Sequence, residues 1–200
     1  GEGNLEVIGT GGAAFGNFNF GISVFLANSR ITSSNGNVKV IGQGGGIGSS
    51  GFNYGVYAEF GGEISAGGSG MVDVYGTGGF SAGIGNTGIY VSYPNSKITS
   101  SGGNVKVTAQ GGGSESSAFN VGVNLIEGGT ITASGGGTVD VFGIGGKTLG
   151  NSNYGIRVVS ANAKITSSGG NVKVTGQGGG IGSSASNFGI YVESESKITA

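Results

Sequence analysis

The sequence predicts an all-β fold, a right-handed parallel β-helix (β-solenoid) with three short strands in each coil. Three observations predict it: a repeat of 33 or 34 residues, short stretches in which Val and Ile alternate with polar residues, and 50 glycines concentrated between those stretches. Such alternation is typical of strands with one buried face, and glycine-rich segments between them are typical of turns. Parallel crossover connections favour the right hand. Collagen is excluded because glycine does not recur at every third position.

The repeat is the first of these observations. Six units align and begin at residues 3, 36, 70, 103, 137 and 170. Successive starts are 33, 34, 33, 34 and 33 residues apart, so the units alternate in length and the full period is a 67-residue double repeat. Regular self-similarity of this kind indicates stacked structural units. We therefore expect one continuous solenoid over residues 1–200, with a rise of about 4.8 Å per coil.

Each unit offers three strands. The first is exemplified by Asn37–Val40, the second follows an Asn-x-Gly step such as Asn53–Gly55, and the third is centred on an isoleucine such as Ile98. Equivalent apolar residues of successive coils then form five inward columns, two from the first strand, two from the second and one from the third. Between the first and second strands lies a long glycine-rich connection, and we expect these connections to stack into one ridge.

An asparagine recurs in every unit, two residues before a glycine. Amide side chains stacked in this way can hydrogen-bond to the coils above and below. We interpret this column as a structural ladder and expect its glycine to adopt a backbone angle that a Cβ would disfavour. A polar ligand site repeated six times is the functional alternative. The ladder consists of Asn19, Asn53, Asn86, Asn120, Asn153 and Asn187.

A second column of equivalent residues, which is charged, explains why the period is doubled. On the outward face of the first strand, charges of opposite sign follow one another: Glu6, Lys39, Asp73, Lys106, Asp140 and Lys173. Copying one unit without change would stack like charges about 5 Å apart, whereas alternation stabilises each pair by roughly 0.2–1 kcal/mol. A less regular third-strand column contains Arg30, Glu63, Lys97, Thr130, Lys164 and Lys197.

The composition argues against an enzyme. The chain has no His and no Cys, which removes most nucleophile–base pairs and soft metal sites. Asp73 and Asp140 lie two coils apart, so they form no carboxylate pair for glycoside cleavage. The stretch Gly67–Asp73 resembles a calcium-binding solenoid repeat but places its aspartate one position late. We expect no catalytic site, no metal and no cofactor.

Net charge and hydropathy limit the classes of partner that this chain is expected to bind. The net charge of −1 offers no basic face for nucleic acid, and no apolar run is long enough to insert into a membrane. Outward tyrosines on the second strand, Tyr57, Tyr90 and Tyr191, can stack on sugars or contact a partner. A column of hydroxyl side chains on the third strand, which includes Thr99 and Thr132, is interpreted as a solvated face; an ice-binding array is the alternative.

The repeats are similar to those of a known group of proteins. The stretch Ile165–Gly180, its near copies at Ile31 and Ile98, and Asn187–Val192 resemble repeats of very large bacterial surface exoproteins, the filamentous-haemagglutinin-like and autotransporter-like β-helix proteins. The resemblance covers the whole chain and concerns repeat style. It implies secretion, an extracellular or cell-surface location, and roles in adhesion or extracellular fibres. It supplies no catalytic residues.

These observations together predict a structural segment of a bacterial surface fibre or stalk. The sequence shows no capping unit at either end, so we expect end-to-end stacking on itself or on adjacent repeats, with lateral bundling as a further possibility. The rival hypothesis is an adhesin that binds glycan or a partner protein through the tyrosine column or the glycine-rich ridge. A polysaccharide-active enzyme is a third, weaker hypothesis.

Overall fold

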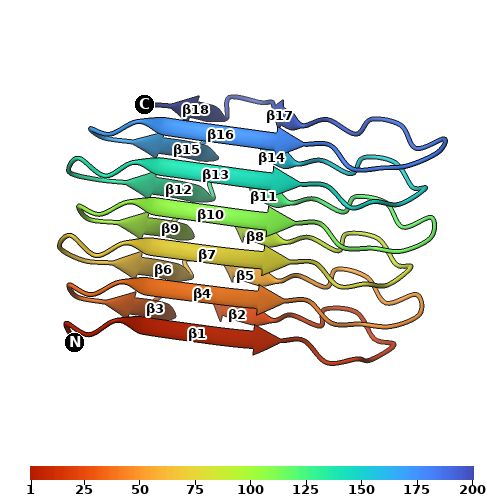
Figure 1. The fold of residues 1–200 in the computed structure, drawn as a ribbon, viewed down its shortest axis with the longest axis horizontal. Helices are drawn as coiled ribbons and strands as arrows, with labels where there is room; N and C mark the ends of the chain where they lie inside the picture. The colour runs from red at the N-terminus through yellow and green to blue at the C-terminus, as the bar shows by residue number, and fades with distance from the viewer.

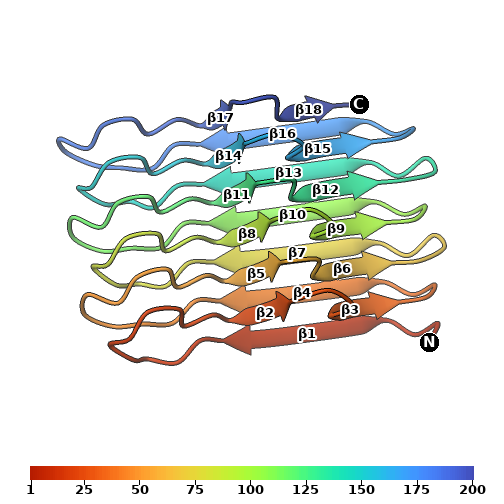
Figure 2. The ribbon, with the colours of Figure 1, turned by 180° about the vertical axis from the view of Figure 1, so that it is seen from behind.

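The computed structural model describes all 200 residues and consists of strands and turns without any helix. Its 18 strands form three parallel sheets of six, so the predicted β-solenoid with three strands per coil and a repeat of about 33 residues is confirmed. The first sheet lies on one side of the molecule, and the two sheets of shorter strands lie on the other (Figures 1 and 2). In Figure 1 the front strands point right and the third-sheet strands point left while the chain climbs, which is a right-handed winding.

Each sheet collects one strand from every coil. The first sheet contains β1 (Leu5–Thr10), β4 (Val38–Gln43), β7 (Val72–Thr77), β10 (Val105–Gln110), β13 (Val139–Ile144) and β16 (Val172–Gln177). The second contains β2 (Ile22–Phe25), β5 (Val56–Glu59), β8 (Ile89–Ser92), β11 (Val123–Ile126), β14 (Ile156–Val159) and β17 (Ile190–Val192). The third contains β3 (Arg30–Ser33), β6 (Glu63–Ala66), β9 (Lys97–Ser100), β12 (Thr130–Ala133), β15 (Lys164–Ser167) and β18 (Lys197–Thr199).

The core consists of the stacked apolar columns. In the second coil Val38, Val40, Val56 and Ile64 are fully or almost fully buried, and the equivalent residues of the other inner coils are buried as well. In-register pairing places each on its counterpart, for example Val38 against Val72. The uniform size of each column suits this packing, because a stack of like side chains leaves no gap between coils.

The first strands are longer than the Asn37–Val40 stretch predicted and add a third inward position. Glycine occupies it in five coils, and in β10 it is Ala109. A Cβ added at Gly42 would lie 2.1 Å from the carbonyl oxygen of Gly55, so this position brings the first strand directly onto the backbone that leads into the second. Close backbone approach, rather than flexibility, therefore explains these strand glycines.

A further inward column, missed in the sequence, closes the third strand. It contains Ser33, Ala66, Ser100, Ala133 and Ser167, all buried. The serine hydroxyls are satisfied by two turns: Ser100 accepts from the amide of Gly103 in the turn that follows (2.9 Å) and donates to the carbonyl oxygen of Gly70 in the equivalent turn one coil earlier (2.7 Å). Small side chains fit here because the third strand bends into the next coil.

The doubled period is also built into the connections. In the first coil the three connections span 11, 4 and 4 residues, and in the second they span 12, 3 and 5. The same two sets alternate through the third, fourth and fifth coils. The short connection between second and third strands uses left-handed Leu26 and Asn28 in the first coil but Phe60 and Gly61 in the second. Odd coils therefore always stack on even coils of different turn geometry.

Candidate functional site

The asparagine ladder lies inside the long connections between the first and second strands. Asn53, Asn86, Asn120 and Asn153 are fully buried, although they occupy a loop. The two legs of each connection close around the amide: a Cβ added at Gly46 would lie 2.5 Å from Nδ2 of Asn53. Gly46 also has a φ of 84°, which favours glycine. The glycine-rich connection is thus a compact loop filled by its own asparagine.

Hydrogen bonds join the ladder from coil to coil. Nδ2 of Asn53 donates to Oδ1 of Asn86 (2.9 Å), and Nδ2 of Asn120 donates to Oδ1 of Asn153 (2.9 Å). Asn19 reaches Asn53 in the same way at 2.9 Å, and Asn153 reaches Asn187 at 3.3 Å. Between the third and fourth coils the backbone amide of Asn86 donates to Oδ1 of Asn120 instead (3.1 Å).

A hydroxyl not recognised in the sequence completes the rungs of the second to sixth coils. Ser50 donates to Oδ1 of Asn53 at 3.1 Å, and Ser117 donates to Oδ1 of Asn120 at 3.0 Å. Even coils place this hydroxyl three residues before the asparagine, whereas the third and fifth coils place it five residues before, as Ser81 does for Asn86 (3.1 Å). The changing offset hid the column from a fixed-period alignment. With its polar atoms paired in this way, the ladder supports a structural role.

The glycine that follows each asparagine has a different purpose from the one predicted. None of these six glycines has a positive φ, so the expectation of an unusual backbone angle was wrong. The reason is space: a Cβ on Gly55 would lie 2.5 Å from the backbone nitrogen of Thr77 in the next coil. The left-handed residue is the one before the asparagine, as at Phe52, with a φ of 55°.

The first-strand charges stand in register, as their alternation requires. Lys106, for example, is paired by its backbone with Asp73 on one side and Asp140 on the other. Only one step closes into an ion pair, between Nζ of Lys39 and Oε1 of Glu6 at 2.8 Å. That contact raises the pKa of Lys39, chiefly through the hydrogen bond to Glu6. Asp73 accepts from the hydroxyl of Tyr75 at 3.0 Å instead.

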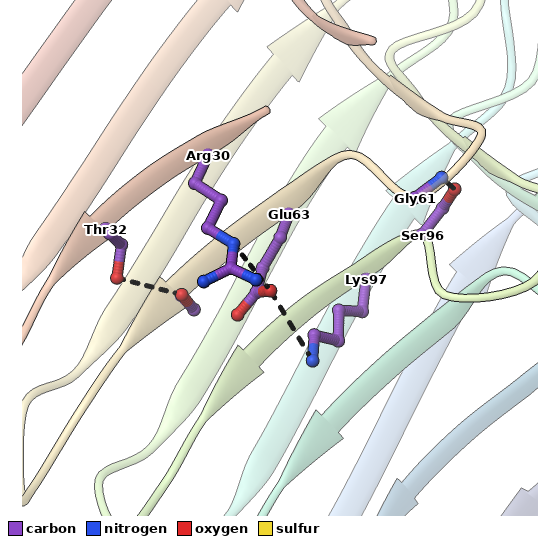
Figure 3. A network of polar contacts seen from close by, with 7 residues as sticks. Arg30, Thr32, Gly61, Glu63, Ser96 and Lys97 are labelled. Atoms are coloured by element: carbon purple, nitrogen blue, oxygen red, sulfur yellow. Dashed lines mark hydrogen bonds and ion pairs between the residues drawn. The ribbon is translucent and has the colours of Figure 1, made fainter. Parts of the chain in front are cut away.

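The third-strand charges form a compact network (Figure 3). Glu63 lies between two cations, with Nε of Arg30 at 3.6 Å and Nζ of Lys97 at 3.5 Å from the same carboxylate oxygen. Beside it the hydroxyl of Ser65 donates to Thr32 at 3.0 Å, so neighbouring hydroxyls of the Thr column pair with each other. At the other end of the sheet Lys164 and Lys197 stand in register without an acid between them.

The predicted tyrosine surface is a layer of stacked rings. The ring of Tyr57 lies 4.6 Å from that of Phe20 and 5.7 Å from that of Tyr90, with interplanar angles of 22°. Tyr57 and Tyr90 are half-buried, so they are less exposed than the predicted surface column implies. Stacking along the solenoid axis covers the faces of Tyr57 on both sides.

Tyr54 and its equivalents belong to this layer, although the sequence analysis missed them. The ring of Tyr54 stacks on Tyr90 at 4.9 Å and lies 5.7 Å from Tyr57. Strict alternation would place it inward with Val56, but the backbone turns at Gly55 and exchanges the two faces. Asn53 and Tyr57 are four residues apart and would share a face of a regular strand, yet Asn53 lies inside the coil and Tyr57 lies outside it. The signal available in the sequence was the aromatic residue within Asn-x-Gly.

Aromatic rings of the first three coils line a shallow groove of about 270 Å³. Phe18, Phe20, Phe52, Tyr54, Tyr57, Glu59 and Tyr90 form its walls. Glu59 is almost buried and accepts a hydrogen bond from the hydroxyl of Tyr57. Burial raises the pKa of Glu59, and the hydrogen bond from Tyr57 offsets part of that rise. Burial also raises the pKa of Tyr90.

Tyr191 lies away from this groove, in the last coil. Its ring stacks on Tyr154 and Phe188, each at 5.5 Å, and its hydroxyl donates to Glu193 at 2.5 Å. The aromatic layer is interrupted in the fourth coil, where Asn124 replaces tyrosine and accepts from Arg157 at 3.3 Å. The structure therefore divides the predicted tyrosine column into two separate clusters.

The fold alone assigns this chain to a class of proteins, the β-solenoids. No protein-family model, curated protein or solved structure matches this chain. No group of three or more acidic, histidine or cysteine side chains is arranged to hold a metal ion. Nor does any helix have the length and hydropathy needed to cross a membrane. Most polar side chains that form columns in this chain contact side chains of the adjacent coils.

Proposed function

We propose that this chain is a structural segment of a long bacterial fibre or stalk outside the cell. The observation that carries the proposal is the complementarity of successive coils. Each coil offers the next one matching apolar columns, an asparagine to hydrogen-bond and a first-strand charge of opposite sign. Because the same register recurs at every step, it can join any number of coils. The bacterial, extracellular location rests on the repeat-style resemblance alone.

The same contacts can join two copies end to end. The last coil presents Lys173 and Asn187, and the first presents Glu6 and Asn19, so charge alternation and the amide ladder would both continue across the junction. Ile190 and Val192 of the last coil are 40% and 44% exposed, whereas their inner equivalents are buried. Covering them would bury further apolar surface. Adjacent repeats of a longer chain would make the same contacts.

Labelling of the native source tests this proposal. Antibodies raised against the 200-residue chain should bind intact cells and decorate filaments seen by electron microscopy. Labelling that appears only after the cells are permeabilised would contradict the extracellular location. Labelling confined to compact particles would contradict the fibre.

A glycan-binding adhesin is the second candidate, and the aromatic groove favours it. Sugars bind to aromatic side chains that are flanked by polar groups, and the groove combines six rings with the Glu59 carboxyl group. Since the faces of Tyr57 are covered, a sugar would contact ring edges, hydroxyls and the flanking Phe18 and Phe52. This arrangement places the adhesive site on the first three coils rather than along the whole tyrosine column.

Glycan-array binding separates the two candidates. Adhesion through the groove requires that the double variant Tyr57→Ala, Tyr90→Ala lose binding, while Tyr191→Ala, in the distant cluster, retains it. Circular dichroism of the variants controls for folding. A chain that binds no glycan, or that loses binding equally with Tyr191→Ala, would count against the groove.

A further inference from the structure

The six long connections form a continuous ridge along one edge of the molecule (Figures 1 and 2). We define the loop ridge as residues 11–21, 44–55, 78–88, 111–122, 145–155 and 178–189. Nine of the chain's 16 exposed large apolar side chains lie in it. Phe15 and Phe80 are 76% and 80% exposed, and Ile47, Ile84, Leu149 and Ile181 of the same ridge are 38% to 51% exposed. Apolar stripes of this kind mark contact surfaces.

The loop ridge is nearly free of charge. It holds only Glu115 and Lys147, whereas the whole chain has nine basic and ten acidic residues. Depletion of charge together with exposed aromatic side chains is typical of the centre of a protein–protein interface. Ordinary solvent-exposed loops show the opposite composition, because water favours charged groups at loop tips.

Backbone hydrogen bonds hold the loops at a fixed spacing. The amide of Ile47 donates to the carbonyl of Ala14 (3.0 Å), and that of Leu149 donates to the carbonyl of Glu115 (2.8 Å). The buried asparagine ladder fixes the base of every loop. Association would therefore order little that is not ordered already, which lowers its entropic cost.

The two charges specify how a second copy would lie. Glu115 belongs to the fourth coil and Lys147 to the fifth; both are exposed, and neither forms an ion pair within the chain. In a parallel, in-register pair of copies, Glu115 would face Glu115. In an antiparallel pair with its two-fold axis between these coils, Glu115 of each copy faces Lys147 of the other. The third coil, with Phe80, then faces Ile181 of the sixth.

We propose that two copies of this chain associate laterally and antiparallel through the loop ridge. The contact buries the exposed apolar side chains of the third to sixth coils of both copies and closes two equivalent Glu115–Lys147 ion pairs, while the first two coils extend beyond it. It goes beyond the proposed function, because a fibre needs only axial stacking, and it would join fibres of opposite direction side by side. Lateral pairing and end-to-end stacking can each occur without the other.

Sedimentation velocity of the 200-residue chain tests the pairing. We expect a concentration-dependent monomer–dimer equilibrium. Glu115→Lys replaces two attractive contacts with two repulsive ones and should weaken the dimer about tenfold at low salt. Lys147→Glu should do the same, and an equimolar mixture of the two variants should restore it. Phe80→Ser should weaken the dimer, whereas Ile8→Ser, an equally exposed apolar residue on the outer face of β1, should not.

Small-angle X-ray scattering identifies the contact. The loop ridge lies at one end of the molecule's longest axis, so pairing through it nearly doubles the maximum dimension (Figure 1). End-to-end stacking adds length along the shorter solenoid axis instead. A chain that stays monomeric, a dimer unaffected by Glu115→Lys, or a dimer of the axial shape would each overturn the proposal. Lateral pairing and the end-to-end stacking on which the fibre proposal depends are therefore distinguished by the direction in which the particle grows.

Discussion

Asn120 illustrates how a single side chain connects three coils of this solenoid. Its Oδ1 accepts from the backbone amide of Asn86 and from the hydroxyl of Ser117, and its Nδ2 donates to Asn153. All of these atoms are buried, so water cannot replace a lost partner. Paired polar groups in the interior favour one register, because a shifted register would leave them unpaired.

Replacing Asn120 with Ala should therefore destabilise the chain strongly. The amide of Asn86 and the hydroxyl of Ser117 would lose a buried acceptor, which costs about 2–4 kcal/mol in free energy of unfolding. Urea unfolding followed by circular dichroism measures the loss. Asn35→Ala is the matched control, since Asn35 is exposed and makes no side-chain hydrogen bond. Equal stability of the two variants would show that the ladder is dispensable.

Glu59 makes stability depend on pH. Burial raises its pKa in the folded chain above that of the unfolded chain, so the folded state binds the proton more tightly. Its contribution is therefore greatest below the ordinary carboxyl pKa and is lost as pH rises through the raised value. Glu59→Gln should melt at a higher temperature than the parent at pH 7 and close to it at acidic pH. Scanning calorimetry over this range measures the difference, and a parent that melts higher at pH 7 would contradict the argument.

At the scale of the strand, alternating charges decide which neighbour a coil accepts. The backbone register places each inner first-strand charge beside two of opposite sign, although only Glu6 and Lys39 approach within 4 Å. The remaining attractions act across solvent and are weaker than closed ion pairs. The charge alternation therefore works chiefly by making a like-charged neighbour unfavourable.

The double variant Asp73→Lys, Asp140→Lys tests this view. It creates a column of five consecutive lysines and should lower the melting temperature by several degrees at low salt, with partial recovery as salt screens the repulsion. Asp73→Asn with Asp140→Asn removes charge without adding repulsion and should have a smaller effect. An identical melting temperature for parent and lysine variant at low salt would reject the charge-ladder explanation.

Coil deletions test the two alternating turn sets. Deleting residues 103–136 removes the fourth coil, stacks odd on odd and brings Asp73 against Asp140. Deleting residues 70–136 removes a full double repeat and preserves both alternations. Solenoids normally gain stability with each added unit. We expect the reverse here: the longer, mismatched protein should unfold at lower urea concentration than the shorter one, as equilibrium titration can measure.

The whole molecule is a stack without a unique centre. Every inner coil lies between two coils of the other turn set, so the molecule grows along its axis while its cross-section stays constant. Inserting a second copy of residues 70–136 after residue 136 should lengthen the axis by roughly 10 Å and leave the cross-sectional radius unchanged. Small-angle scattering distinguishes this outcome from a thicker or expanded particle, which would mean that the added repeat does not stack in register.

Periodic features of the fold could be predicted from the sequence, because each depends only on position within the repeat. The 67-residue period, the three strands and the apolar columns follow from alternation and from stacking of like residues. The asparagine column could be recognised for the same reason, since its spacing to the second strand never changes. The hydroxyl partners could not, because their offset from the asparagine differs between odd and even coils.

The sequence by itself determined which residues recur and therefore which lie above one another. Only the tertiary structure decided where their side chains point and what they touch. Tyr54 joins the outer aromatic layer because the backbone turns at Gly55, and Asp73 contacts Tyr75 instead of closing an ion pair with a lysine. Backbone dihedrals at a turn and competition between nearby partners are three-dimensional properties. The apolar loop ridge likewise appears only when six separate connections are brought to one edge.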